Sequence, residues 1–341
     1  MRCFTTVVLT CGLMALVPVP VKAQLILKTE LSVLCDQADA VVVGRAENVR
    51  KEGSTTMVIA GTSYPADQMV AQLAVDKVLK GSPKTGVMSF NFSLPRTLAM
   101  NVTVRGVVAG QYGVFFLRSG GDGYQVLDPD YPCVVAFPGS PQTSGSVLDQ
   151  VTAEVCYVLE SREATHNGKQ DALLVLRGVS SPIATKALKA ASRDPVADVR
   201  LSAMALLLRS NDISELPMAE NILLHPPSDI DPNALDGLAF AIRFGVHDPK
   251  AIPSLARLVL AKNVNVRKGA ATALRRTHDS AAIRPLTQAL NDTDPDVLFQ
   301  AVVGLGELTH TSGEWVPGED LFLKDQKRYL DHWREWAKSQ K

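Results

Sequence analysis

The stretch Asp194-Pro195-Val196-Ala197-Asp198-Val199-Arg200 decides the fold of the second half of this chain. Apolar residues recur at helical spacing before it, in residues 183–191, and after it, in residues 199–206. An Asp at such a corner predicts a helix N-cap, and a Pro just inside the helix lacks the N–H that the first turn cannot use. The stretch therefore predicts two helices joined by a tight polar corner.

The same pattern recurs along the second half of the chain. Alanine-rich segments with matching apolar positions begin at Val199, Ala234, Val266 and Val297, so the copies recur every 31 to 35 residues. Each copy is preceded by a segment with helical spacing, at residues 183–191, 218–224, 252–260 and 283–290. A helix pair of this size has two apolar faces and cannot bury both alone, so the copies are expected to stack.

With this corner and an alanine-rich second helix, residues 180–310 resemble HEAT repeats of the short kind named after phycobilin lyases. The copy at 194–200 matches best, the last copy has Leu298 where Arg is usual, and the copy at 231–245 is degenerate. The resemblance implies an α-helical solenoid that binds a protein or peptide partner. The motifs do not encode the chromophore chemistry of the lyases.

The first half of the chain reads as strands. Short apolar runs are bounded by Gly, Pro, Asp or Asn at residues 40–44, 70–79, 87–94, 102–108, 112–117, 124–127 and 134–137. Many short strands at roughly even spacing predict a small barrel or sandwich. A slip in the alternation between Val75 and Val78 indicates a bulge, and the glycine-rich stretch 120–123 predicts a hairpin turn.

Three stretches, 38–45, 75–81 and 110–118, are similar to bacterial exported domains related to the netrin/metalloproteinase-inhibitor type of OB barrel. The resemblance implies a small OB-like β-barrel over residues 24–140. It also raises a second function, inhibition or regulation of an exported enzyme through the barrel. Inhibitors of that superfamily ligate the protease zinc with a free N-terminal cysteine, whereas the nearest cysteine to Gln24 is Cys35.

The N-terminus has the layout of a secretory signal. Met1-Arg2 is followed by an apolar stretch, and Val21-Lys22-Ala23 places small residues at the −3 and −1 positions. This layout predicts a signal peptide over residues 1–23 and a secreted or periplasmic protein. Pro18 and Pro20 shorten the apolar run below the roughly 18 to 20 residues of a spanning helix, so no stable membrane insertion is expected after cleavage.

The remaining boundaries follow from changes in pattern. A Pro/Ser/Gly-rich stretch at 141–146 ends the strands, so residues 141–179 are assigned to a linker and first helices. In the segment 311–341, Tyr329, Trp333 and Trp336 share one helix face. We expect a C-terminal helix that caps the array, with an exposed aromatic binding stripe as the alternative.

Charge and motifs narrow the function. The chain has 35 basic and 35 acidic residues, and loss of Arg2 and Lys22 with the signal leaves a slight acidic excess, which gives no long-range attraction to nucleic acid. Neither a nucleophile elbow nor a zinc-protease or phosphate-loop motif occurs. The sequence therefore predicts a binding or scaffolding protein that is not an enzyme and needs no metal or cofactor. An enzyme whose site is assembled from scattered residues is the alternative.

Two sets of side chains are candidates for specific roles. Near the C-terminal ends of the second helices lie Arg209, Arg243, Arg275 and Arg276. Stacking would bring these arginines into a partner-binding ladder, unless they only complement the helix dipoles. Of the cysteines beyond residue 23, Cys35 and Cys133 are predicted to form a disulfide within the barrel, which leaves Cys156 as a thiol.

Histidines recur in register as well. His247, His278 and His310 each follow a second helix. Metal binding is one interpretation, and a repeated polar loop residue is the other.

Overall fold

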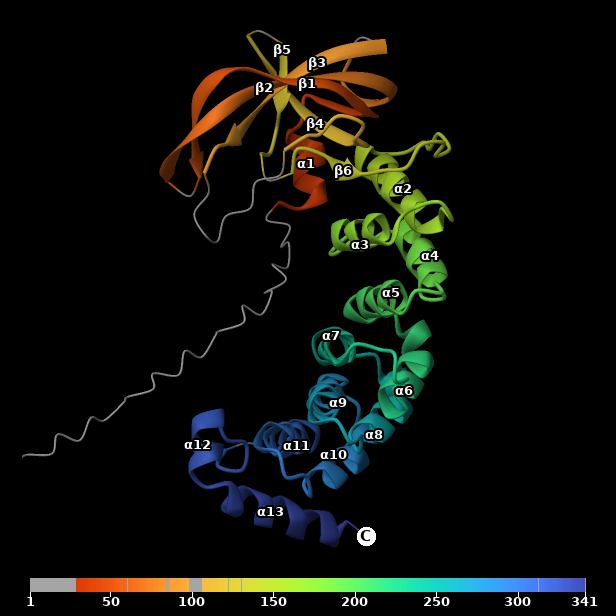
Figure 1. The fold of residues 1–341 in the computed structure, drawn as a ribbon. Helices are drawn as coiled ribbons and strands as arrows, with labels where there is room; N and C mark the ends of the chain where they lie inside the picture. Colours follow the sequence, from red (N-terminus) through yellow and green to blue (C-terminus); the bar gives the residue numbers. More distant parts are fainter. Residues whose placement is uncertain are drawn as a thin grey trace, which may run out of the picture.

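The computed structural model describes residues 29–59, 61–83, 86–97, 106–121, 123–129, 131–311 and 313–340. The predicted signal peptide, residues 1–23, lies outside the described residues. A strand-rich part near the N-terminus is followed by a curved array of helices (Figure 1). In the described part of the chain, no helix is long and apolar enough to cross a membrane.

The strand-rich part combines one short helix with a six-stranded sheet. Its elements are α1 (Leu31–Gln37), β1 (Ala40–Ile59), β2 (Thr62–Lys80), β3 (Gly86–Pro95), β4 (Tyr112–Gly120), β5 (Gly123–Val126) and β6 (Val134–Val135).

The strand pairings close into a ring. Antiparallel pairs join β1 to β2, β2 to β3 and β4 to both β1 and β5, and a short parallel pair joins β3 to β5. The two-residue β6 adds to β4. Gly120 pairs with Gly123, so the hairpin turn predicted at residues 120–123 is confirmed.

The first hairpin is longer than the sequence predicted. The expected strands at 40–44 and 70–79 are the ends of β1 and β2, which continue through residues that carry mostly polar side chains. Those residues are largely exposed, so no alternating pattern marks them as strand. The predicted bulge is confirmed, because Val43 pairs with Lys77 and Gly44 pairs with Val75, which leaves Asp76 without a partner in the register.

One further strand expectation is only partly testable. Of the strand predicted at residues 102–108, residues 106–108 are not in a strand, and the remainder lies outside the described residues.

Both faces of the sheet are buried where β1 begins and where β4 pairs with it. Ala40, Val42 and Phe115 belong to one apolar cluster. Their neighbours Val41 and Val43 belong to another, which also contains residues of α1 and of the first helices of the array. Burial on two faces explains why these strands are continuous apolar runs rather than alternating ones.

The helical part begins at residue 147. Its helices are α2 (Val147–Glu160), α3 (His166–Val175), α4 (Pro182–Ala191), α5 (Ala197–Arg209), α6 (Leu216–Leu224), α7 (Pro232–Gly245), α8 (Ile252–Leu258), α9 (Val264–Arg276), α10 (Ile283–Ala289), α11 (Pro295–Leu308), α12 (Glu319–Lys324) and α13 (Gln326–Ser339). Short 3₁₀ turns at Ile213–Glu215, Pro249–Ala251 and Ser280–Ala282 lead into α6, α8 and α10.

The helices form two rows. We call α3, α5, α7, α9 and α11 the inner helices and α2, α4, α6, α8 and α10 the outer helices, because the array curves with the first set on its concave side (Figure 1). Inner helices pack against inner helices, as in the pairs α5–α7, α7–α9 and α9–α11. The segment predicted to hold the linker and first helices supplies α2 and α3, which pack against α4 and α5.

The corners between helices use aspartate in two ways. Asp294 caps α11 by accepting from the amides of Asp296 and Val297, with Pro295 in the first turn, as predicted. Asp231 and Pro232 begin α7 in the same way, so the degenerate copy has a regular corner. Asp194 differs from the predicted N-cap, because Val196 is the capping residue and the Asp194 carboxylate accepts from the Val196 amide.

Asp194 is also half of an ion pair between helix pairs. Its carboxylate lies 2.6 Å from the Lys169 ammonium of α3. Burial acts to raise the pKa of Asp194, but the hydrogen bonds from Lys169 and the Val196 amide outweigh it and hold that pKa below its usual range. The corner therefore ties α5 to the preceding pair instead of capping its own helix.

At the C-terminal end, α12 and α13 cover the last repeat. Trp333 and Phe322 are fully buried, and the Phe322 ring lies 5.6 Å from that of Phe299 on α11. The Trp333 indole donates to the carbonyl of Trp315. Trp333 and Tyr329 thus pack inward and do not form an exposed aromatic stripe.

A buried ion pair fastens the sheet to the array. The Lys77 ammonium of β2 lies 2.7 Å from the carboxylate of Glu154 on α2 and donates to the carbonyl and hydroxyl of Ser140. Ser140 also hydrogen bonds Glu154. The Glu154 side chain is 3% exposed, so Lys77 is its counter-charge in a site that water does not reach freely.

Replacing Lys77 with Met should destabilise the protein by about 3–5 kcal/mol, because Glu154 would keep a buried charge without a partner. The matched control is Lys51→Met, which removes an exposed ion pair with Asp67 and should cost about 0–1 kcal/mol. Urea unfolding of the two variants measures the difference, and equal losses would contradict a special role for Lys77.

Close approach of the inner helices depends on glycine. A Cβ atom added to Gly245 at the end of α7 would overlap the backbone of Leu208 and Arg209 in α5. A Cβ added to Gly237, earlier in α7, would have no neighbour within 4 Å.

We therefore expect opposite effects from two identical substitutions. Gly245→Ala should destabilise the array by about 1–3 kcal/mol through overpacking. Gly237→Ala should stabilise it by about 0.5–1 kcal/mol through helix propensity. Thermal unfolding of both variants checks the contrast, and a stabilising Gly245→Ala would show that α5 and α7 are not held at this distance.

Candidate functional site

The predicted arginine set divides into two kinds of contact. Arg209 ends α5 and lies exposed, with its guanidinium carbon 5.7 Å from the centre of the Phe240 ring on α7. Arg243 lies 5.3 Å from the ring centre of Phe244 on its own helix. The two rings are 4.4 Å apart, so two arginines and two phenylalanines form a continuous patch on the inner helices α5 and α7.

The other two arginines are engaged within the array. Arg275 makes a bidentate ion pair with Glu307 of α11, at 2.6 and 2.8 Å, and also donates to Gln300. Arg276 donates to the Arg243 carbonyl at 3.1 Å, near the C-terminal end of α7. Arg276 therefore contacts the C-terminal end of the preceding inner helix, where the helix dipole favours a positive charge.

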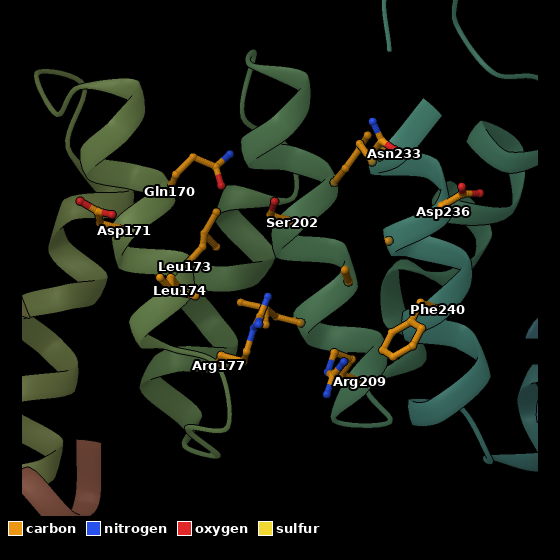
Figure 2. A pocket seen from close by; sticks show the side chains of 15 residues that line it. Gln170, Asp171, Leu173, Leu174, Arg177, Ser202, Arg209, Asn233, Asp236 and Phe240 are labelled. Atoms are coloured by element: carbon orange, nitrogen blue, oxygen red, sulfur yellow. The ribbon is translucent and has the colours of Figure 1, made fainter. Parts of the chain in front are cut away.

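A groove crosses the inner helices next to this patch. It has a volume of about 680 Å³, within the size range of sites for small ligands or short segments. Its walls come from α3, α5 and α7 (Figure 2). The lining residues are Gln170, Asp171, Leu173, Leu174, Arg177, Leu201, Ser202, Ala205, Leu206, Arg209, Asn233, Ala234, Asp236, Gly237 and Phe240.

The groove is polarised along the helix axes. Arg177 and Arg209 lie at one edge, and Gln170, Ser202 and Asn233 lie toward the other, with Asp236 on the same helix as Asn233 (Figure 2). Aliphatic side chains line the floor between the two edges. We call the edge with Arg177 and Arg209 the basic edge.

Sequence reasoning missed Arg177. This residue follows α3, where no Asp-Pro corner marks a repeat, so α3 was not aligned with the later copies. The available signal was the spacing, because Arg177 precedes Arg209 by 32 residues, close to the repeat period. In the structure, Arg177 and Arg209 lie at the same edge of the groove (Figure 2).

The basic edge is not neutralised from within. Among the residues that the structure describes, Arg177 and Arg209 form no ion pair. By contrast, Arg267 on α9 lies 2.6 Å from the carboxylate of Asp292. Asp236, at the opposite edge, accepts hydrogen bonds from the neutral amides of Asn263 and Asn265 and forms no ion pair within the described residues.

The recurring histidines belong to the turns that follow the inner helices. His278 and His310 adopt left-handed φ angles of 51° and 55° in the turns that follow α9 and α11, and Asn211 does so after α5. The Asn211 side chain accepts from the amides of His247 and Asp248. Within the described ranges, no group of three or more His, Cys, Asp or Glu side chains is arranged to hold a metal ion.

The predicted disulfide is not formed in the structure. Cys35, Cys133 and Cys156 are all free thiols. Cys35 belongs to the cluster between the sheet and the helices, whereas Cys133 packs against the cluster on the other face of the sheet, so the sheet separates them. Spacing along the chain does not reveal on which face of a strand a cysteine lies.

The surroundings of these cysteines also disfavour the reactive thiolate form. Burial raises the pKa of the Cys35 thiol to about 12, as it does for Cys156. Cys35 is 3% exposed, so it does not offer the free thiolate that an inhibitor of the metalloproteinase type presents to zinc.

Comparison with known proteins identifies part of the array. The family model of HEAT repeats matches residues 216–306, from the start of α6 into α11. None of the curated proteins matches the chain. Among solved structures, human deoxyhypusine hydroxylase in complex with glycerol is similar at 16% identity and a TM-score of 0.25, over 56% of this chain and 73% of that chain.

That similarity corrects one expectation. The prediction that the chain is not an enzyme is contradicted, because the similar structure is named as a hydroxylase. Motif searches detect sites whose residues are close in sequence, whereas stacked repeats can assemble a site from separate helices. At this TM-score the likeness supports no particular activity.

The match confirms the predicted repeats over its own range. Residues 216–306 are HEAT repeats, and through α7 they supply one wall of the groove.

Proposed function

We propose that this chain is an exported protein that binds a protein partner through the groove on its inner helices. The observation that carries the proposal is an exposed aromatic pair beside uncompensated arginines. Phe240 and Phe244 are 52% and 49% exposed, although phenylalanine side chains are usually buried. Aromatic residues and arginine are the types enriched at the centres of protein interfaces.

Shape supports the same surface. HEAT-type arrays present extended concave faces to their partners. The groove lies on that face and is bounded by three inner helices, so a partner segment would contact α3, α5 and α7 together. The Arg209 guanidinium already contacts the face of the Phe240 ring in the unbound chain. A side chain that is ordered before binding loses little conformational freedom on binding.

The sheet has a supporting role in this proposal. We interpret its closed ring of pairings, with β3 parallel to β5, as a small OB-like barrel. It covers the apolar end of the array, since one cluster runs from Val41 and Phe116 to α5. A solenoid needs such a cover at each end to stay soluble.

Export is the part of the proposal that rests on sequence alone. We expect the mature protein to begin at Gln24 and to be released from an envelope fraction without detergent, because residues 1–23 have the layout of a cleaved signal. Mass spectrometry of the intact protein from its native host checks this expectation. Retention of residues 1–23 would contradict it.

Partner binding is tested by removing the aromatic pair. The double variant Phe240→Ala/Phe244→Ala should lower partner recovery from the envelope fraction at least about tenfold, because central aromatic anchors each contribute about 2 kcal/mol or more. The matched control is Leu321→Ala/Leu323→Ala, which removes side chains of similar exposure, 57% and 50%, from α12.

The full-length chain is used as bait in each case. Circular dichroism should show both variants folded, since exposed substitutions change stability by about 0.5 kcal/mol or less. Undiminished recovery by the phenylalanine variant, or an equal loss in the leucine control, would rule out the groove as the binding surface.

A further inference from the structure

We infer that the groove takes an acidic, extended segment of its partner, with two carboxylates facing Arg177 and Arg209. This inference rests on the proposed function and specifies the partner's chemistry. Two guanidinium groups of the basic edge lack an ion-pair partner within the described chain, and a planar guanidinium pairs best with a carboxylate in a bidentate arrangement.

The array itself marks where the site ends. On the next inner helix, α9, the arginine in the corresponding position is Arg275, which forms an ion pair with Glu307. Arg276 is turned back onto the Arg243 carbonyl. Among the arginines near the C-terminal ends of the inner helices, those without an ion pair or a carbonyl partner in the described chain therefore lie beside the groove.

The opposite edge fixes the orientation of the segment. Asp236 receives hydrogen bonds only from amides, so its charge would repel a carboxylate placed near it. Between the edges, Leu206 and Phe240 offer apolar surface. An acidic side chain is thus directed to the basic edge, and an uncharged apolar side chain fits the floor.

Helix spacing sets the spacing of the carboxylates. Packed helices lie about 8–10 Å apart, so Arg177 of the α3 end and Arg209 of α5 are separated by about that distance along the groove. An extended chain in the polyproline II conformation advances about 3.1 Å per residue and repeats its side-chain direction every three residues. The segment should therefore carry its two acidic residues about three positions apart.

The probe for this inference is an end-blocked, fluorescein-labelled peptide of eight residues, with two glutamates three positions apart among valines and serines. Two matched peptides carry glutamine or lysine in place of both glutamates. Fluorescence anisotropy with the full-length protein measures binding. The glutamate peptide should bind at least about tenfold more tightly than the glutamine peptide, and raising the salt should weaken it.

Three variants locate the interaction. Arg177→Glu and Arg209→Glu should each weaken the glutamate peptide about tenfold or more. The matched control is Arg284→Glu, which makes the same charge change at an exposed position on the outer helix α10 and should leave binding unchanged. Circular dichroism confirms that all three variants are folded.

Several results would overturn the inference. These are no binding of the glutamate peptide at millimolar concentration, equal binding of the three peptides, or an equal loss in Arg284→Glu. A dimer in solution that Arg209→Glu dissociates would also overturn it, because the occupant would then be a second copy. If the peptides fail while partner recovery still depends on Phe240 and Phe244, the proposed function stands and only this inference falls.

Discussion

Stacking of helix pairs is the constraint on which this structure depends. Each pair has apolar surface on both sides and can bury it only against a neighbour. Within the array, the neighbours approach so closely that Gly245 and Gly269 lie against the backbone of the preceding inner helix. At the two ends the neighbour is something else, the sheet beyond α2 and α3 and the aromatic face of α13 beyond α11.

The stacking also explains why charged groups of the same register meet. Inner helices that lie side by side bring their C-terminal ends to one edge, where the partial negative charge of the last carbonyls favours arginine. Whether such an arginine is available to a partner then depends on one further residue. On α11 that residue is Glu307, which occupies Arg275, whereas no acidic residue of α5 or α7 pairs with Arg209 in the described structure.

Periodicity in the sequence predicted the elements whose burial is one-sided and regular. The helix pairs from α4 to α11 and the end of β2 were found in this way, whereas the start of β1 was found as a short continuous apolar run. The distal part of the first hairpin was not, because its pairing is by backbone and its side chains face water. The Asp194 turn also escaped, since the same aspartate that can cap a helix is drawn to Lys169 of another one.

The arginines of the candidate site could be located from the sequence only in part, for a related reason. Arg209 and Arg243 were identified from repeat register, and they do lie on the inner helices. Pairing between helices, as in Arg275 with Glu307, is decided by side-chain reach across a gap that the sequence does not specify. The groove itself had no sequence signal, because it is lined by side chains from three helices that are separate in the sequence.

In the proposed function, the sheet supports the first wall of the groove. The α3 wall belongs to the same apolar cluster as β1 and β4, and Lys77 fixes β2 to α2 through Glu154. Moving the sheet would therefore require moving α2 and α3 with it, since a packed interior does not deform continuously. A segment bound across α3 and α5 would press on the junction between sheet and repeats. The sheet and the first helices thus share one core, and through that core the sheet holds the first wall of the groove in place.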